Sequence, residues 1–128
     1  MRTAHQTTIE IKPTEHQIQT QIINFLKYKS WFVMRLNSGK ISVGEGRSRR
    51  MIQMNEVGTP DIMAFRRFVR TCDVHSIGTL HLDLLFIEVK RPGNKPTLHQ
   101  KMKMRELESF GARCLVAHSV EEVEEAIA

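Results

Sequence analysis

The sequence predicts a single α/β domain in which helices cover the faces of a mixed sheet. Two apolar runs, at 62–65 and 82–90, are typical of strands. Apolar residues at helical spacing follow Thr14 and again follow Pro96. A length of 128 residues suits one domain. We therefore expect the order helix, three strands, helix, strand, helix.

The N-terminal part is predicted to hold a polar arm and the first helix. Residues 1–12 are polar, and segment 8–11 fits either an edge strand or an unstructured arm. Thr14 and Gln17 match a capping box, in which each side chain satisfies a free backbone N–H of the first turn. The buried stripe of this helix is Ile18, Ile22, Phe25 and Leu26. Glu15 lies one turn before this stripe, so it either points toward the body of the domain or merely complements the positive helix end.

The first core strand is predicted at 31–36, and a cationic loop is predicted after it. The turn residues Asn37-Ser38-Gly39-Lys40 close this strand. Residues 41–50 are rich in Gly, Ser and Arg and have little apolar periodicity, which predicts a long flexible loop. Beside an active site such a loop could grip phosphates, although a charge run is more often simply solvated.

The second and third strands are predicted at 61–65 and 82–90. Between them, the apolar residues of 66–82 are too irregular to define an element, so a hairpin extension and a loop with a short helix both fit. These apolar residues are Val69, Val74, Ile77 and Leu80. The nearly continuous apolar run of the third strand predicts burial on both faces.

The second helix is predicted to start near Pro96, which suits a first helical turn, and to stop at Gly111. Gln100, Met104 and Leu107 share one face, so we expect Gln100 to face the sheet. The basic residues Lys101, Lys103 and Arg105 lie off that face and can meet solvent or a phosphate.

The chain is predicted to end in a strand and a short helix. The strand at 113–117 should run parallel to the third strand, because a strand–helix–strand unit makes a right-handed crossover. Ser119 and Glu122 match a capping box for the last helix. Its buried stripe is Val120, Val123 and Ile127.

Composition favours a nucleic-acid partner. The net charge is +5 and the pI is about 9.6, which suggests a polyanionic ligand. No run resembles a membrane span, and two distant cysteines, Cys72 and Cys114, argue for a reducing cytoplasm and against a zinc site. The residues predicted to contact DNA are Arg35, Lys40, Arg47, Arg49, Arg50, Arg91, Lys95 and Lys101.

Three charged residues predict a metal-dependent site. Along a strand the side chains alternate, so Glu88 and Lys90 share one face. Gly58-Thr59-Pro60 leads into Asp61, and pairing of the two strands would bring Asp61 close to Glu88. Two acidic oxygen donors beside a lysine suit a hard divalent cation and a phosphate. Taken singly, each piece has an ordinary explanation as a turn or a solvated strand end.

The set Gly58-Thr59-Pro60-Asp61, Glu88-Val89-Lys90 and Gln100 resembles the PD-(D/E)xK nuclease superfamily. With Glu15 and Arg35-Leu36-Asn37-Ser38-Gly39 it resembles the VRR-NUC family, including its small stand-alone phage and bacterial members. The resemblance implies a restriction-endonuclease-like fold over the whole chain. It implies Mg²⁺ or Mn²⁺ on Asp61, Glu88 and the Val89 carbonyl, with Glu15 as a further candidate ligand, and catalytic roles for Glu15, Asp61, Glu88, Lys90 and Gln100.

The resulting hypothesis is a DNA endonuclease that hydrolyses phosphodiester bonds, similar to Holliday-junction resolvases. Its expected partners are duplex or four-way-junction DNA and a second copy of the chain, in the cytoplasm of a bacterium or a phage-infected cell. Val69, Val74, Ile77 and Leu80 either pack against that copy or cap their own monomer. Two alternatives stay open: a non-catalytic DNA-binding module with a nuclease-like fold, and a nuclease that acts on RNA or duplex ends.

Overall fold

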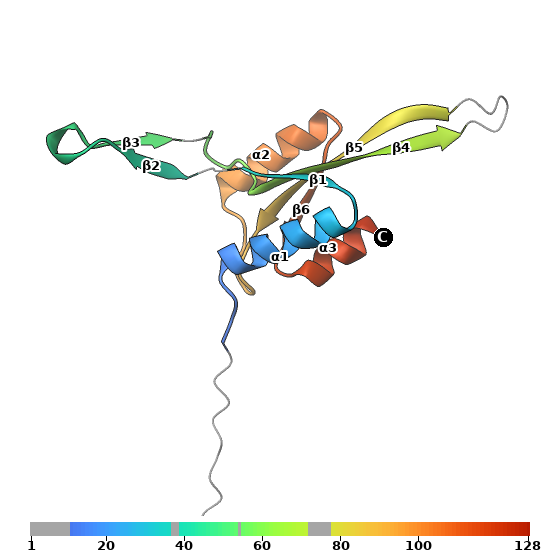
Figure 1. Cartoon of the computed structure of the whole chain (residues 1–128), viewed down its shortest axis with the longest axis horizontal. Coiled ribbons are helices and arrows are strands. Elements are labelled where there is room, and N and C mark those ends of the chain that lie inside the picture. The colour runs from blue at the N-terminus through green and yellow to red at the C-terminus, as the bar shows by residue number, and fades with distance from the viewer. Residues whose placement is uncertain (1–10, 37–38, 54, 72–77) are drawn as a thin grey trace, which may run out of the picture.

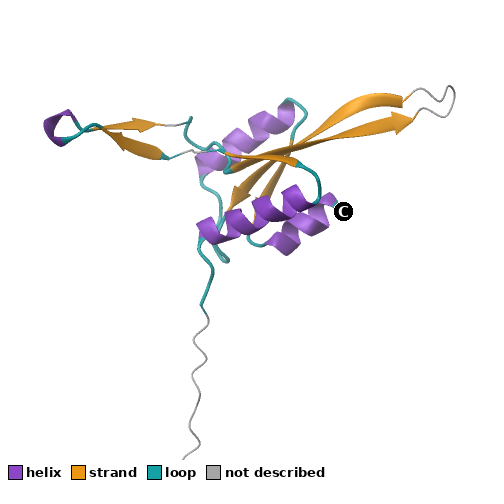
Figure 2. Cartoon of the chain, viewed as in Figure 1, coloured by secondary structure: helices purple, strands orange, loops and turns teal. Residues whose placement is uncertain are grey.

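The computed structural model describes residues 11–36, 39–53, 55–71 and 78–128. Its body is a four-stranded sheet in the order β1-β4-β5-β6 (Figure 1). Helices α1 and α3 cover one face, and α2 lies on the other (Figure 2). The bounds are α1 Glu15–Tyr28, β1 Phe32–Arg35, β4 Ile62–Thr71, β5 Gly78–Val89, α2 Leu98–Ser109, β6 Arg113–Ala117 and α3 Val120–Ile127.

The strand pairing confirms the predicted topology. The first three body strands form an antiparallel meander, with β1 paired to β4 and β4 to β5. After the α2 crossover, β6 pairs with β5 in parallel, so that Val89 lies opposite Ala117. The predicted edge strand at 8–11 begins in residues that lie outside the described part of the chain.

Side-chain caps start the three helices. Thr14 and Gln17 form the predicted capping box of α1, and Thr97 with Gln100 forms a second one at α2. At α3 the Ser119 hydroxyl accepts the Glu122 N–H, as predicted. The Glu122 carboxylate does not complete that box, because it accepts the N–H of His118 instead of that of Ser119.

The main core lies between the sheet and the pair α1 and α3. Ile18, Ile22 and Leu26 of α1 pack on β4 and β5, and Val123 of α3 joins them. Burial of these side chains contributes about 1.5–3 kcal/mol each, which holds the helices on the sheet without help from the site. On the opposite face the core is smaller and includes Met104 of α2.

The structure corrects the prediction of a flexible loop at 41–50. Strands β2 (Lys40–Val43) and β3 (Arg50–Gln53) pair antiparallel around a 3-10 turn, η1 (Gly46–Ser48). Gly44 has a φ of +90°, and a Cβ there would lie 2.7 Å from the Ser48 carbonyl oxygen. The sequence hides this hairpin because each strand has only four residues and arginines interrupt the apolar alternation.

The segment between the second and third predicted strands is a hairpin extension, one of the two open alternatives. Strand β4 continues to Thr71 and β5 starts at Gly78, and Phe68 stacks on His81 across the pair. Burial on both faces holds only for Leu85–Val89, since Leu82 is 61% exposed. Among the described residues no helix is long and apolar enough to cross a bilayer.

Candidate active site

Strand register brings two predicted carboxylates together at one end of the sheet. Ile62 of β4 lies opposite Ile87 of β5, so the next pair along the ladder places Asp61 beside Glu88. The Val89 N–H donates to Asp61 Oδ2 at 2.7 Å and thereby orients this carboxylate. The Leu36 N–H donates to the Asp61 carbonyl, also at 2.7 Å, so β1 fixes the backbone there.

Glu88 is a buried carboxylate without full compensation. Its residue is only 2% exposed, and its Oε2 has no hydrogen-bond partner within the described residues. Its Oε1 lies 3.6 Å from Lys90 Nζ. Burial, followed by the negative charge of Asp61, raises the pKa of Glu88 to about 8. Burial also raises the pKa of Asp61. Ionising both carboxyl groups is therefore unfavourable here, and a bound cation would offset that cost.

Lys90 provides a cation at the same end of the sheet. The backbone N–H of Lys90 donates to the Ala117 carbonyl at 3.0 Å, so β6 holds the backbone while the side chain extends toward Glu88. The side chain is mostly buried, with 13% exposed, and its ammonium lies beside Glu88 Oε1. This ammonium lowers the pKa values of both carboxyl groups, but less than burial raises them.

The turn before Asp61 is held against the start of α2. Gly58 has a φ of +87°, and a Cβ there would lie 2.5 Å from the His99 carbonyl oxygen. Lys103 forms an ion pair with Glu56 in the same turn, and Thr59 Oγ1 donates to the Glu56 carbonyl. The sequence did not predict this ion pair, because Glu56 lies 47 residues away from Lys103 and no local pattern indicates it.

Within the described residues, Glu15 and Gln100 form no hydrogen bond or ion pair with Asp61, Glu88 or Lys90. Glu15 is half-buried at the start of α1, and its charge is a lesser cause of the raised pKa values of Asp61 and Glu88. In the part of the chain that the structure describes, no group of three or more His, Cys, Asp or Glu side chains could hold a metal. The Gln100 amide oxygen accepts the Thr97 N–H at 2.8 Å, so it serves the helix cap.

Two carboxylates are still enough for the expected ion. Mg²⁺ in phosphoryl-transfer sites is usually held by one or two carboxylates together with water and substrate phosphates. The donors here are all oxygen atoms, which suits Mg²⁺ or Mn²⁺ better than softer metals. The unpartnered Glu88 Oε2 is the specific feature that such a cation would satisfy. The residues present therefore fit the metal that the sequence resemblance implies.

The predicted DNA-binding residues lie on three parts of the molecule. Arg35 donates to the Thr20 hydroxyl at 3.1 Å beside α1. The β2–β3 hairpin carries Lys40, Arg47, Arg49 and Arg50. Exposed positions near Lys90 and on α2 hold Arg91, Lys95 and Lys101.

A histidine contacts the turn that follows Lys90. His118 Nε2 lies 2.9 Å from the Asn94 carbonyl, and Nδ1 lies 3.2 Å from Glu122 Oε2. The Asn94 carbonyl, and then the Glu122 carboxylate, raise the pKa of His118. These two contacts connect Glu122 of α3 with the turn that follows Lys90. No spacing in the sequence indicates this role.

One solved structure similar to this chain is described as "VRR_NUC domain". It is 22% identical, the alignment covers 88% of this chain and 92% of that chain, and the TM-score is 0.53. A scan against protein-family models and a search of curated proteins found no match. This likeness confirms the predicted fold, a restriction-endonuclease-like mixed α/β fold of the kind that a VRR_NUC domain has.

Proposed function

We propose that this chain, which has the fold of a VRR_NUC domain, is a metal-dependent DNA endonuclease of the VRR-NUC type. The observation that carries the proposal is the buried, unpartnered oxygen of Glu88 beside Asp61 and Lys90. Burying carboxylates without partners is unfavourable, so a site that does so without a cation would only destabilise the fold. A cation and a phosphodiester account for all three side chains at once.

Asp61, Glu88 and the Val89 carbonyl are the groups that would hold Mg²⁺ or Mn²⁺. When bound, such an ion supplies positive charge for phosphate oxygens and acidifies water. Asp61 is pre-oriented by the Val89 N–H, and Glu88 is held within β5, so neither group needs to be ordered when substrate binds. Glu15 contributes from α1 by its negative charge rather than by direct contact with the pair.

Lys90 is positioned to act on the phosphate or on the attacking water. Its ammonium shares the sheet face with Glu88 and is close enough to donate to a phosphodiester oxygen placed over the carboxylates. In that position it would offset the negative charge that develops in the transition state. Arg91, Lys95 and Lys101 lie exposed near this end and would bind the DNA backbone.

Cleavage should require a divalent cation and depend on DNA structure. We expect Mg²⁺ or Mn²⁺ to support cleavage, with a four-way junction cut faster than a plain duplex, because the resemblance is to structure-selective resolvases. The experiment compares duplex, flap, fork and four-way-junction DNA with each metal and with EDTA. No cleavage of any of these substrates with either metal would favour the non-catalytic DNA-binding module instead.

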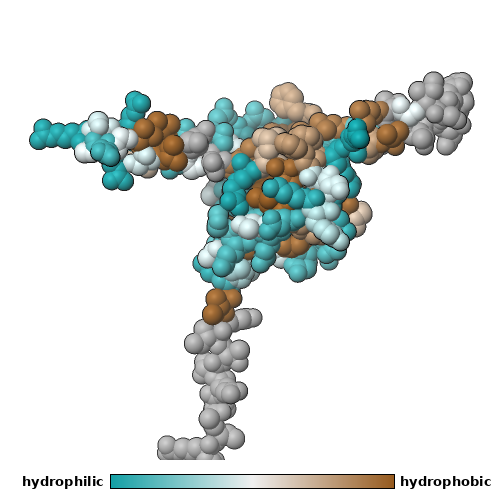
Figure 3. Space-filling view, viewed as in Figure 1, coloured by the Kyte–Doolittle hydropathy of each residue, from teal (hydrophilic) through white to brown (hydrophobic). Residues whose placement is uncertain are grey.

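A second copy of the chain would allow paired cuts across a junction. Supporting this part of the proposal, Val69, Leu80 and Leu82 lie on one face of the β4–β5 hairpin and are each at least 60% exposed. Phe32 and Met34 of β1 continue this apolar face. Figure 3 shows hydrophobic surface where the β4–β5 hairpin leaves the body. The residues Val74 and Ile77, which we also predicted to pack on a second copy, lie outside the described part of the chain.

Light scattering tests this dimer. We expect twice the chain mass of 14.8 kDa at micromolar concentration, and a monomer for Leu80→Lys/Leu82→Lys, since two charges on an apolar interface repel. A monomeric wild-type chain, both free and with a four-way junction, would contradict the dimer. In that case we would expect a monomeric nuclease that cuts duplex or flap DNA in the cytoplasm.

A further inference from the structure

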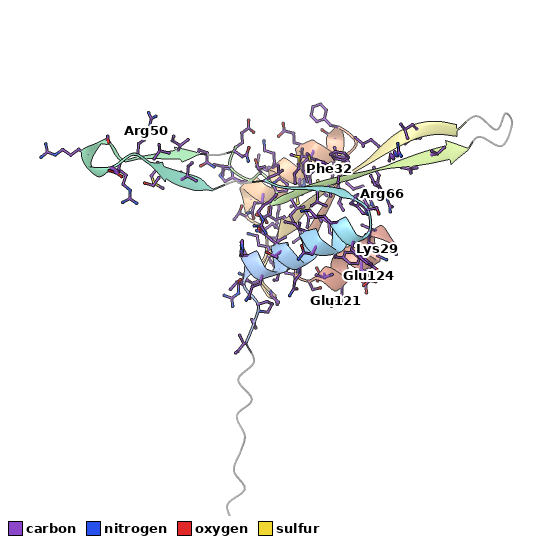
Figure 4. All side chains as sticks on the ribbon, in the orientation of Figure 1. Lys29, Phe32, Arg50, Arg66, Glu121 and Glu124 are labelled. Carbon is purple, nitrogen blue, oxygen red and sulfur yellow. The ribbon has the colours of Figure 1, made fainter. Side chains whose placement is uncertain are left out.

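Strands β2 and β3 with η1 form an arm, residues 40–53, that projects from the body (Figures 1 and 4). A lone two-stranded hairpin is marginally stable in water. The arm nevertheless exposes large apolar side chains, with Ile41 at 45%, Met51 at 61% and Ile52 at 36%. These observations indicate that the arm is a surface completed by a partner.

The two faces of the arm differ in character. Cross-strand pairing places Ile41 opposite Ile52 and Val43 opposite Arg50, which makes one face mainly apolar. The other face pairs Lys40 with Gln53 and Ser42 with the exposed Met51, and Arg49 Nε donates to Ser42 Oγ at 2.6 Å. The arm therefore combines exposed apolar side chains with basic and polar donors, and Arg50 shares the face of Ile41 and Ile52.

Charge identifies the partner as a polyanion. The arm carries four basic residues and one acidic residue, Glu45. Within the described residues no salt bridge involves Arg47 or Arg50. Arg49 is held by Ser42, whereas Arg47 and Arg50 remain available for an external phosphate.

Both ends of the arm return to the candidate active site. The chain leaves the body after Leu36, whose N–H donates to the Asp61 carbonyl at 2.7 Å. It returns through the turn of Glu56 and Gly58, which α2 holds, and then reaches Asp61. A ligand of the arm would thus lie next to whatever Asp61 and Glu88 bind.

We propose that the arm enters the major groove of B-form DNA beside the scissile phosphate. Paired strands lie about 4.8 Å apart, and with side chains they exceed a minor groove about 6 Å wide but fit a major groove about 12 Å wide. Each strand of the arm has four paired residues and is roughly 14 Å long, which is the length of about four base pairs. The deep, narrow major groove of A-form RNA and a single strand offer no such fit.

This inference rests on the proposed nuclease function, but its test is separate, because it measures binding to an uncut duplex in Ca²⁺. Arg47→Ala/Arg50→Ala should bind a 20-base-pair DNA at least about tenfold more weakly than the wild type. The negative slope of log affinity against log salt should become shallower by about 1.8, as expected for two lost phosphate contacts. The matched control is Lys27→Ala/Lys29→Ala on α1, which should retain wild-type binding.

Three outcomes would overturn the arm's assignment. One is wild-type affinity and salt slope in the arm variant. Another is an equal loss of binding to duplex DNA, single-stranded DNA and double-stranded RNA, which would indicate charge attraction without groove fit. The third is a changed oligomeric state of the variant without DNA, which would assign the arm to a protein interface. Because Arg47 and Arg50 are exposed, both variants should melt as the wild type does.

Discussion

Asp61→Asn and Glu88→Gln should each lower the rate of DNA cleavage by about a thousandfold or more. The substitutions keep the size of each side chain but remove the charge that would hold the cation, and cation stabilisation of phosphoryl transfer amounts to several kcal/mol. DNA binding should change little, because the basic residues that contact the backbone remain. Single-turnover cleavage and equilibrium binding in Ca²⁺ measure the two effects separately.

The matched control for these variants is Asp83→Asn. Asp83 belongs to β5 like Glu88 and is also shielded from solvent, but it forms ion pairs with Arg66 and Arg113. We expect it to retain wild-type cleavage at a temperature where it is folded. Equal activity of Asp61→Asn, Glu88→Gln and the wild type would reject the site, whereas equal loss in all three variants would point to general destabilisation.

Glu88→Gln should stabilise the metal-free protein at alkaline pH. The pKa of Glu88 is about 8 when folded against an ordinary value of 4.5, so the folded state holds its proton to higher pH than the unfolded state. Stability is therefore full below about pH 4.5 and is lost as pH rises through 8. The loss is on the order of 5 kcal/mol, and the variant, which has no charge to bury, should avoid it.

Urea unfolding at pH 5, 7 and 9 in EDTA tests this expectation. The free energy of unfolding of the wild type should fall with pH, while that of Glu88→Gln should fall much less, since Asp61 is then the only carboxyl group of the pair left to ionise. Adding Mg²⁺ at pH 8 should restore stability to the wild type and not to the variant. A wild type that is most stable at pH 9 without metal would contradict the burial of an uncompensated carboxylate.

Local patterns were sufficient to predict the body of the fold. The cap at Thr14 has a direct sequence signature, and the right-handed crossover rule sets the parallel pairing of β5 and β6. The proximity of Asp61 and Glu88 follows from pairing two apolar strands. These features depend on spacing within one element or on a general rule of chain connection.

The remaining features depend on contacts that no short window contains. The ion pair of Lys103 with Glu56 joins residues far apart in sequence, and so does the contact of His118 with the Asn94 carbonyl. Gln100 matched a motif position, yet its amide oxygen caps α2, because the same glutamine also satisfies the spacing of a capping box. The arm escaped prediction because its short strands expose both faces.

Binding of Mn²⁺ without DNA tests the central claim most directly. Electron paramagnetic resonance at pH 7.5 can follow free Mn²⁺ during titration of the wild type, Glu88→Gln and Asp83→Asn. We predict saturable binding by the wild type and by Asp83→Asn, and binding at least about tenfold weaker by Glu88→Gln, since it loses a direct ligand. Identical titrations for all three proteins would contradict a metal centre at Asp61 and Glu88.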